Sequence, residues 1–346
     1  MEDFKSNISR ISRIVNDSTF LLHVDFGPHR DPMYILLPIT IIYSVIFATG
    51  LFGNIITCTV IVRDRTMHTT TNCYLFNLAI SDIIFLLFGV PYETYWLWWK
   101  WPYPFDPAFC PIRALISETS TNVSVMTITL FTIERYLAIC FPFLSRKMAK
   151  TSRAAKQLVA LWIVALISAL PGALEFGVST HIGITTCHQV RTIVKHYFEI
   201  STFLFFLAPM VLITILCCLI GLALKKSDLS KDKPNVTLEM RVTAQVQEKH
   251  SQSTRRVIKM LVAVVVTFFI CWAPFHAQRL LIIYATSNGV KFEQINRAIT
   301  ILTYVSGVFY YLSTCINPIL YHIMSNKFRE AFKNTLMQCC RRGARS

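Results

Sequence analysis

Residues 34–62 read YILLPITIIYSVIFATGLFGNIITCTVIV, an apolar run without a single charged side chain. About 20 such residues in an α-helix cross the roughly 30 Å of hydrocarbon in a lipid bilayer. Because backbone polar groups must be paired inside a bilayer, the run predicts a membrane-spanning helix. Six further predominantly apolar runs of similar length follow, at residues 71–99, 107–140, 155–175, 196–224, 254–286 and 295–322, and several of them contain a few charged residues. The sequence therefore predicts an all-α membrane protein, a bundle of seven transmembrane helices.

The composition agrees with this fold class, and the loop charges predict its orientation. Hydrophobic residues make up 53% of the chain and charged residues only 15%, which is too few for a water-soluble surface. Lys and Arg gather in one set of connectors, which the positive-inside rule assigns to the cytoplasm. We therefore expect a multi-pass plasma-membrane protein with an extracellular N-terminus (1–33), a seven-helix domain (34–322) and a cytoplasmic amphipathic helix and tail (323–346). The net charge of +15 is spread between apolar runs, which argues against nucleic-acid binding.

The predicted extracellular face carries two kinds of modification signal. Asn7 and Asn16 each begin an N-x-S acceptor in the N-terminal segment, and we expect both to be glycosylated. The topology leaves Cys110 and Cys187 as the two cysteines at the oxidising outer face. It therefore predicts a disulfide between them.

The predicted cytoplasmic end carries a lipidation signal. Residues 327–332, KFREAF, form a short amphipathic stretch, and Cys339 and Cys340 follow it. Cysteines beside such a helix are typical palmitoylation sites. Acylation there would hold the helix at the inner leaflet.

Asp82 lies in the middle of the second span, where an unpaired charge is costly and marks a functional site. Other spans supply polar neighbours at Ser124, Ser313 and Asn317. We expect these residues to enclose water or a sodium ion, and we expect no other metal or cofactor. A protonated Asp82 with a purely structural hydrogen bond is the alternative.

Glu134-Arg135-Tyr136 stands at the cytoplasmic end of the third span, and its adjacent opposite charges can pair at rest and separate on activation. An ordinary charge pair near the membrane surface is the alternative. Prolines inside three other spans favour a switch, because a proline removes a helical hydrogen bond and bends the helix. These motifs are Pro209, Cys271-Trp272-Ala273-Pro274 and Asn317-Pro318-Ile319-Leu320-Tyr321.

Together these motifs resemble those of the rhodopsin-like G-protein-coupled receptors, over essentially the whole chain. The resemblance implies a switch at the G-protein side made by Arg135 and Tyr321, and a sodium pocket around Asp82. It also implies a heterotrimeric G protein and arrestin as cytoplasmic partners. The residues that would relay ligand binding are Trp272, Phe268, Val125 and Pro209. One departure is Cys217, where the family commonly has a tyrosine that stabilises the active state.

Three charged residues are placed to line a cavity in the outer part of the bundle. Glu118 precedes Arg135 by about 25 Å of helix, and Glu93 lies about three turns beyond Asp82. Arg279 lies about two turns beyond the tryptophan of the sixth span. Two buried acids favour a cationic ligand group and an arginine favours a carbonyl or carboxylate, features that a peptide combines. An internal salt-bridge network without ligand contact is the alternative.

Longer strings narrow the resemblance. FNLAISD, TFLFFLAPM, CWAPFHAQRLL and SGVFYYLSTCINPILY are similar to the neuromedin U receptors and the invertebrate pyrokinin and capa (periviscerokinin) receptors. That group recognises amidated peptides ending in arginine and one more residue. The resemblance implies that Glu93 and Glu118 bind the peptide arginine, that Arg279 approaches the C-terminal end, and that signalling runs through a Gq-type protein to calcium release. The residues that would pack around the peptide are Phe275, His276 and Tyr310.

Other functions lack the residues they require. Residues 298–321 contain no lysine that could hold retinal. Receptors for biogenic amines share an aspartate at the position of the third span where this chain has Ser117. The absence of internal repeats argues against a proton-coupled transporter with Asp82, Glu93 and Glu118 as a relay. We therefore expect a receptor and not an enzyme, with a receptor for another peptide class, or such a transporter, as the alternatives.

Overall fold

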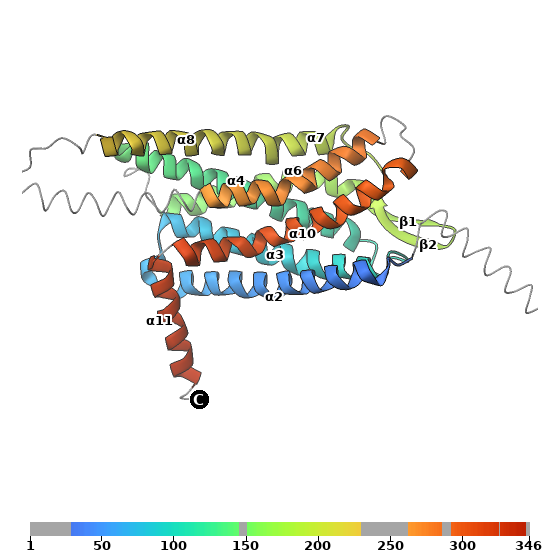
Figure 1. The fold of residues 1–346 in the computed structure, drawn as a ribbon, viewed down its shortest axis with the longest axis horizontal. Helices are drawn as coiled ribbons and strands as arrows, with labels where there is room; N and C mark the ends of the chain where they lie inside the picture. Colours follow the sequence, from blue (N-terminus) through green and yellow to red (C-terminus); the bar gives the residue numbers. More distant parts are fainter. Residues whose placement is uncertain (1–28, 145–150, 230–261, 286–291, 325, 344–346) are drawn as a thin grey trace, which may run out of the picture.

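In a computed structural model, the described part of the chain contains seven helices long and apolar enough to cross a membrane (Figure 1). The structure describes residues 29–144, 151–229, 262–285, 292–324 and 326–343. The predicted all-α seven-helix bundle is therefore confirmed, although residues 254–261 of the predicted sixth span lie outside the described residues. The spanning helices are α2 (Met33–Arg63), α3 (Thr70–Trp98), α4 (Phe109–Cys140), α6 (Thr151–Glu175), the fifth span Tyr197–Ala223, the helix Val262–Ala285 and α10 (Phe292–Met324).

The two ends of the bundle differ in structure (Figure 1). One end, here the hairpin end, carries the antiparallel strands β1 (Phe176–His181) and β2 (Ile184–Gln189). The other, here the α11 end, carries the amphipathic helix α11 (Asn326–Gly343), which turns away from the bundle direction. The short 3-10 helix η1 (Arg65–Met67) connects α2 to α3.

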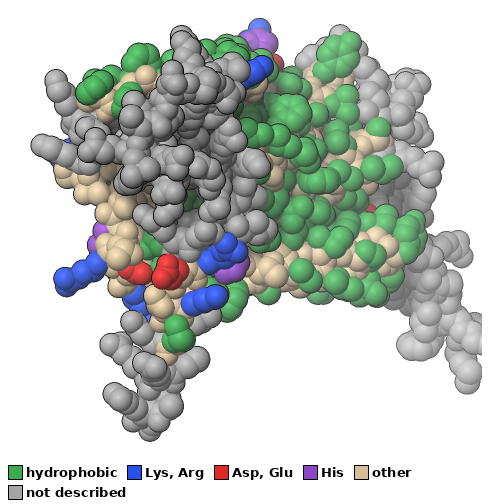
Figure 2. Space-filling view, turned by 60° about the vertical axis from the view of Figure 1, so that its left-hand side comes forward, with side chains coloured by type: hydrophobic (Ala, Val, Ile, Leu, Met, Phe, Trp, Pro, Cys, Tyr) green, Lys and Arg blue, Asp and Glu red, His purple; other side chains and the backbone are tan. Residues whose placement is uncertain are grey.

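The outward surface of the bundle is apolar. Figure 2 shows hydrophobic side chains covering the long face of the bundle, with charged side chains gathered toward its end. A continuous exposed apolar surface of this size marks contact with another apolar phase. Because the helices satisfy their own backbone groups, this surface suits bilayer hydrocarbon. Exposed examples are Leu37, Ile41, Phe52, Val159, Ile163 and Ile167.

Polar contacts inside the bundle join neighbouring helices. Trp162 Nε1 of α6 donates to Asn77 Oδ1 of α3 at 2.8 Å, and Asn77 Nδ2 donates to Thr127 Oγ1 of α4 at 2.8 Å. At Gly89 the absence of a side chain matters, because a Cβ there would lie 2.5 Å from the Tyr311 hydroxyl oxygen. These contacts bring α3 close to α4, α6 and α10, and α3, α4 and α10 also line the two cavities in the bundle.

The fifth span is not one regular α-helix. It comprises α7 (Tyr197–Thr202), a π-helical turn η2 (Phe203–Leu207) and α8 (Ala208–Leu229). The wide turn ends two residues before Pro209. Proline has no N–H to donate, and its ring clashes with the carbonyl four residues earlier in a regular α-helix. The helix irregularity predicted from Pro209 is therefore present as a π-helical turn.

Candidate ligand-binding site

A cavity of about 400 Å³ lies in the bundle at the hairpin end, between α3, α4, the helix Val262–Ala285 and α10. Five of the six residues predicted to contact ligand line it: Glu93, Glu118, Phe275, Arg279 and Tyr310. The sixth, His276, is buried outside the lining. Its Nδ1 lies 3.1 Å from Thr202 Oγ1, and its ring stacks on Phe206 with centroids 4.5 Å apart. His276 therefore joins the helix Val262–Ala285 to the fifth span.

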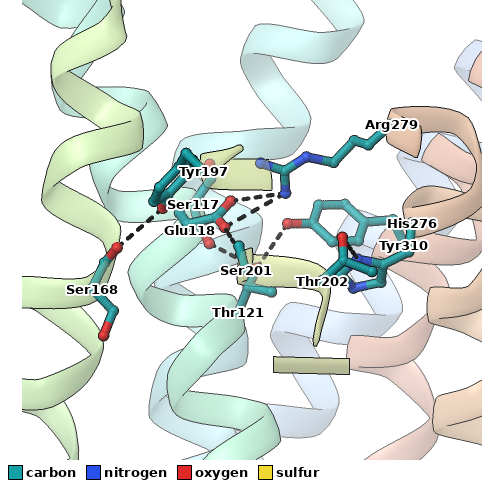
Figure 3. Close-up of polar contacts among 10 residues, drawn as sticks. All are labelled: Ser117, Glu118, Thr121, Ser168, Tyr197, Ser201, Thr202, His276, Arg279 and Tyr310. Atoms are coloured by element: carbon teal, nitrogen blue, oxygen red, sulfur yellow. Dashed lines mark hydrogen bonds and ion pairs between the residues drawn. The ribbon is translucent and has the colours of Figure 1, made fainter. Parts of the chain in front are cut away.

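Glu118 is held by two helices that face α4 (Figure 3). Arg279 Nη1 lies 3.3 Å from Glu118 Oε2 and 3.5 Å from Oε1, and Ser201 Oγ donates to Oε1 at 3.0 Å. The Arg279 guanidinium also lies 4.2 Å from the ring centroid of Phe198, a cation–π contact. The ion pair thus connects α4 directly to the helix Val262–Ala285.

Glu93 has a different partner, Arg113, which the sequence patterns did not predict. Arg113 Nη1 lies 3.6 Å from Glu93 Oε1, and its guanidinium lies 3.8 Å from the ring centroid of Tyr92. The Glu93 side chain is 31% exposed, compared with 14% for Glu118. Both acids of the cavity are therefore paired with arginines, and the Glu93 pair is the looser and more accessible one.

Aromatic side chains connect this cavity to the centre of the bundle. Tyr310 stacks on Phe275 with centroids 4.3 Å apart, and its hydroxyl lies 2.7 Å from Thr121 Oγ1. The Trp272 ring meets Tyr310 edge-on at 5.1 Å and stacks on Phe268 at 5.0 Å. A displacement of Tyr310 by a ligand would therefore act on Trp272 directly. Val125 is fully buried in the same cluster.

A second cavity of about 20 Å³ lies around Asp82 and is lined by all four residues predicted to form a sodium pocket. Asn317 Nδ2 donates to Asp82 Oδ2 at 3.0 Å, and Ser124 Oγ lies 3.0 Å from Ser81 Oγ. Ser313 Oγ donates to the carbonyl of Tyr310 at 2.7 Å. The volume suits a single water-sized occupant. The described part of the chain contains no metal-ligating cluster of three or more His, Cys, Asp or Glu side chains. An ion in this cavity would be held by the Asp82 carboxylate and neutral oxygens.

At the α11 end, Glu134 pairs with Arg153 from the first turn of α6. Within the described residues Arg135 has no ion pair or hydrogen bond. Its Nε is buried without a partner, and its guanidinium lies 5.4 Å from the ring centroid of Phe131. This differs from the expected pairing of the adjacent charges, because a cation from the neighbouring helix takes the carboxylate.

The other predicted switch residues lie close to this end. Tyr321 is buried in a cluster with Tyr74 and Phe131, and its hydroxyl has no hydrogen-bond partner in the described part. Pro318, beside Asn317, packs against the backbone of α2 at Gly53. The Tyr136 ring meets Phe141 at 5.7 Å. Cys217 is half-buried and packs against the clusters of both ends, without the hydroxyl of the tyrosine it replaces.

The predicted disulfide is present. Cys110 at the start of α4 is bonded to Cys187 in β2, with Cα atoms 5.9 Å apart, so the hairpin is attached to the rim of the larger cavity. Asn7 and Asn16 lie outside the described residues, as do the side chains of Cys339 and Cys340. Their modification stays a prediction.

The sequence is similar to those of known proteins. Residues 53–321 match the family described as 7 transmembrane receptor (rhodopsin family). The chain is 49% identical to the pyrokinin-1 receptor of Drosophila melanogaster, over 90% of this chain and 82% of that protein. It is 36% identical to neuromedin-U receptor 2 of Mus musculus (91% and 78% covered) and 34% identical to neuromedin-U receptor 1 of Homo sapiens (91% and 77%). The family match includes every residue predicted for ligand binding and switching.

Proposed function

The chain belongs to the rhodopsin family of seven-transmembrane receptors, and we propose that it detects an amidated neuropeptide of the pyrokinin, capa or neuromedin U kind. It is a receptor and not an enzyme, and it acts as a multi-pass membrane protein with a peptide outside and a G protein inside. In this proposal the N-terminus is extracellular, the G protein is of the Gq type, calcium release follows, and arrestin binds the same cytoplasmic face.

The arrangement of charge in the larger cavity supports this ligand most directly. Arg279 shares its guanidinium with Glu118 at 3.3 and 3.5 Å, so a ligand group that reaches Arg279 also meets a carboxylate. A C-terminal amide matches this pair, because its carbonyl accepts from Arg279 while its NH₂ donates to Glu118. A free C-terminal carboxylate accepts only and is repelled by Glu118. The pair therefore favours amidated over free-acid peptides.

The looser pair suits the peptide arginine. A ligand guanidinium can replace Arg113 on Glu93, because their 3.6 Å contact is long and Glu93 is partly accessible. The displaced Arg113 keeps its contact with the Tyr92 ring, so it is not left without a favourable neighbour. The two acids thus have separate roles in the proposal: Glu93 recognises the arginine side chain, and Glu118 with Arg279 recognises the amidated end.

A charge-by-charge test separates these roles. Calcium release is measured in cells expressing the receptor, with an amidated arginine peptide, its free acid and its citrulline analogue. Glu93→Gln should lower the potency of the arginine peptide about tenfold or more and leave the citrulline analogue nearly unchanged. Glu118→Gln should instead reduce the difference in potency between the amidated peptide and its free acid. Glu199→Gln, which changes an acid bonded to His196 outside the cavity, is the matched control.

Two outcomes would contradict the proposal. Equal losses for all three peptides in the Glu93 and Glu118 variants would make the ion pairs internal supports without ligand contact. A surface-expressed receptor that responds to no amidated peptide would belong to another peptide class. A selective Gq inhibitor in the same assay tests the coupling, because calcium release should then disappear.

The proposal also includes a sodium ion in the small cavity. Asp82 supplies the carboxylate of this cavity, and Ser124, Ser313 and Asn317 in the same lining would supply neutral oxygens to a single ion. When bound, the ion would neutralise the Asp82 carboxylate inside the bundle.

A further inference from the structure

The charge arrangement at the α11 end carries an inference beyond ligand recognition. Glu134 stands in α4 and Arg153 in the first turn of α6, two helices that pack side by side (Figure 1). Their side chains form an ion pair and are only 10% and 26% exposed. An ion pair that is partly withdrawn from water is screened less than a surface pair. Arg153 therefore competes effectively for the carboxylate.

The competitor that loses this carboxylate is Arg135. It follows Glu134 directly in α4, so its long side chain can reach the same oxygens. Among the described residues, however, it makes no ion pair or hydrogen bond with Glu134 and is attracted to that carboxylate only at longer range. Its guanidinium lies 5.4 Å from the ring centroid of Phe131, and its Nε has no hydrogen-bond partner. Burying an arginine nitrogen without a hydrogen bond is unfavourable. An ion pair with Glu134, or a hydrogen bond to an acceptor on a partner protein, would therefore stabilise the Arg135 guanidinium.

We propose that Arg153 is a positioning residue that holds Glu134 away from Arg135 and so keeps Arg135 available to the G protein. One carboxylate is shared between two guanidinium groups, and the state of the receptor depends on which of them it holds. With Arg153 in place, Arg135 is free to bind the partner, and the receptor signals at a basal level without peptide. Without Arg153, Glu134 turns to Arg135 and withdraws it. This inference rests on the proposed coupling to a G protein.

The test measures basal nucleotide exchange without peptide. Full-length receptor in membranes is mixed with Gq, Gi or Gs heterotrimers, and exchange is normalised to receptor number. Arg153→Gln should lower basal exchange about fivefold or more, the scale of a typical coupling between two sites. Arg153→Lys keeps the positive charge and should retain most of the basal exchange. Lys156→Gln, an exposed cation three residues further along α6, is the matched control and should leave exchange unchanged.

A double variant separates positioning from simple anchoring of α6. In a Glu134→Gln receptor no carboxylate remains to withdraw Arg135, so adding Arg153→Gln should change basal exchange little. An equal fall in both backgrounds would make Arg153 a structural anchor and overturn the proposal. An Arg153→Gln receptor with unchanged or raised exchange would also overturn it, as would a wild-type receptor without exchange above receptor-free membranes. Failure of every amidated peptide, with this pattern intact, would overturn only the ligand assignment.

Discussion

Asp82 is the residue at which a sodium ion would act, and its charge can be removed without changing its size. An ion in the small cavity stabilises the packing seen around Asp82 and Asn317, so a peptide that favours another packing binds more weakly in its presence. Peptide affinity should therefore be about fivefold lower in sodium chloride than in choline chloride at equal ionic strength. Asp82→Asn should abolish this difference.

The control for this measurement lies on the same helix. Glu93→Gln removes the other carboxylate of α3, outside the small cavity, and should weaken peptide binding while keeping its dependence on sodium. A sodium effect that persists in Asp82→Asn would place the ion elsewhere or leave Asp82 with a purely structural hydrogen bond.

At this scale, helical spacing predicted which side chains share a cavity but not which of them pair. Glu118 and Arg279 could be placed at similar heights because 1.5 Å per residue converts sequence distance into depth. The partner of Glu93 could not be predicted in this way. Arg113 lies in the first turns of α4, and the direction of its side chain depends on how α4 packs against α3. The ion pair of Arg153 with Glu134 was not predicted for the same reason, because the sequence does not show that the first turn of α6 lies beside the end of α4.

One buried carboxylate ties the end of α6 to the hairpin and to the segment that follows it. Glu175 ends α6, is 1% exposed and accepts hydrogen bonds from Gln189 Nε2, Ile193 N and Val194 N at 2.8, 2.9 and 3.1 Å. Glu175→Ala removes the acceptor for two backbone N–H groups and should cost about 2 kcal/mol of stability. The melting temperature in detergent should fall, and peptide affinity with it, because the hairpin lines the cavity.

Glu199→Ala provides the comparison for this element. The Glu199 carboxylate accepts from the side chain of His196, three residues before it, at the exposed start of the fifth span. Its loss should leave both melting temperature and affinity nearly unchanged. Equal behaviour of the two variants would mean that the disulfide and the backbone hydrogen bonds, such as Tyr103 N to the Thr185 carbonyl at 2.8 Å, hold the hairpin without the Glu175 carboxylate.

Elements were predictable where their signal extends over many residues. Each spanning helix sums hydropathy over about 20 positions, so local irregularities do not hide it. The hairpin was missed because its turn has no typical signature: Ile182 and Gly183 adopt φ values of +49° and +77°, and such turns normally contain Asn-Gly or Asp-Gly. The π-helical turn before Pro209 was likewise reduced to an unspecified bend, because proline predicts disruption but not its form.

The bundle has one end on each side of the membrane. The residues just before α2 contact the hairpin end. Asp31 pairs with Lys100 Nζ at 2.7 Å and accepts a hydrogen bond from the Tyr304 hydroxyl, so the chain enters the bundle beside the larger cavity, which Tyr304 lines. The disulfide lies at this same end. If this end faces outward, Asn7 and Asn16 enter the secretory lumen and their acceptors are available for glycosylation.

Glycosylation therefore reports the orientation of the whole receptor. Treatment with an N-glycosidase should shift the wild-type protein to lower apparent mass, and Asn7→Gln combined with Asn16→Gln should remove that shift. Asn235→Gln changes an acceptor that the same topology places in the cytoplasm, so it should leave the shift intact. The reverse pattern, a mass shift lost only in Asn235→Gln, would put the larger cavity on the cytoplasmic side. The basic connectors mark the cytoplasmic face, and the glycosylated acceptors would independently mark the extracellular face. If both give the same topology, the direction in which the receptor signals is established.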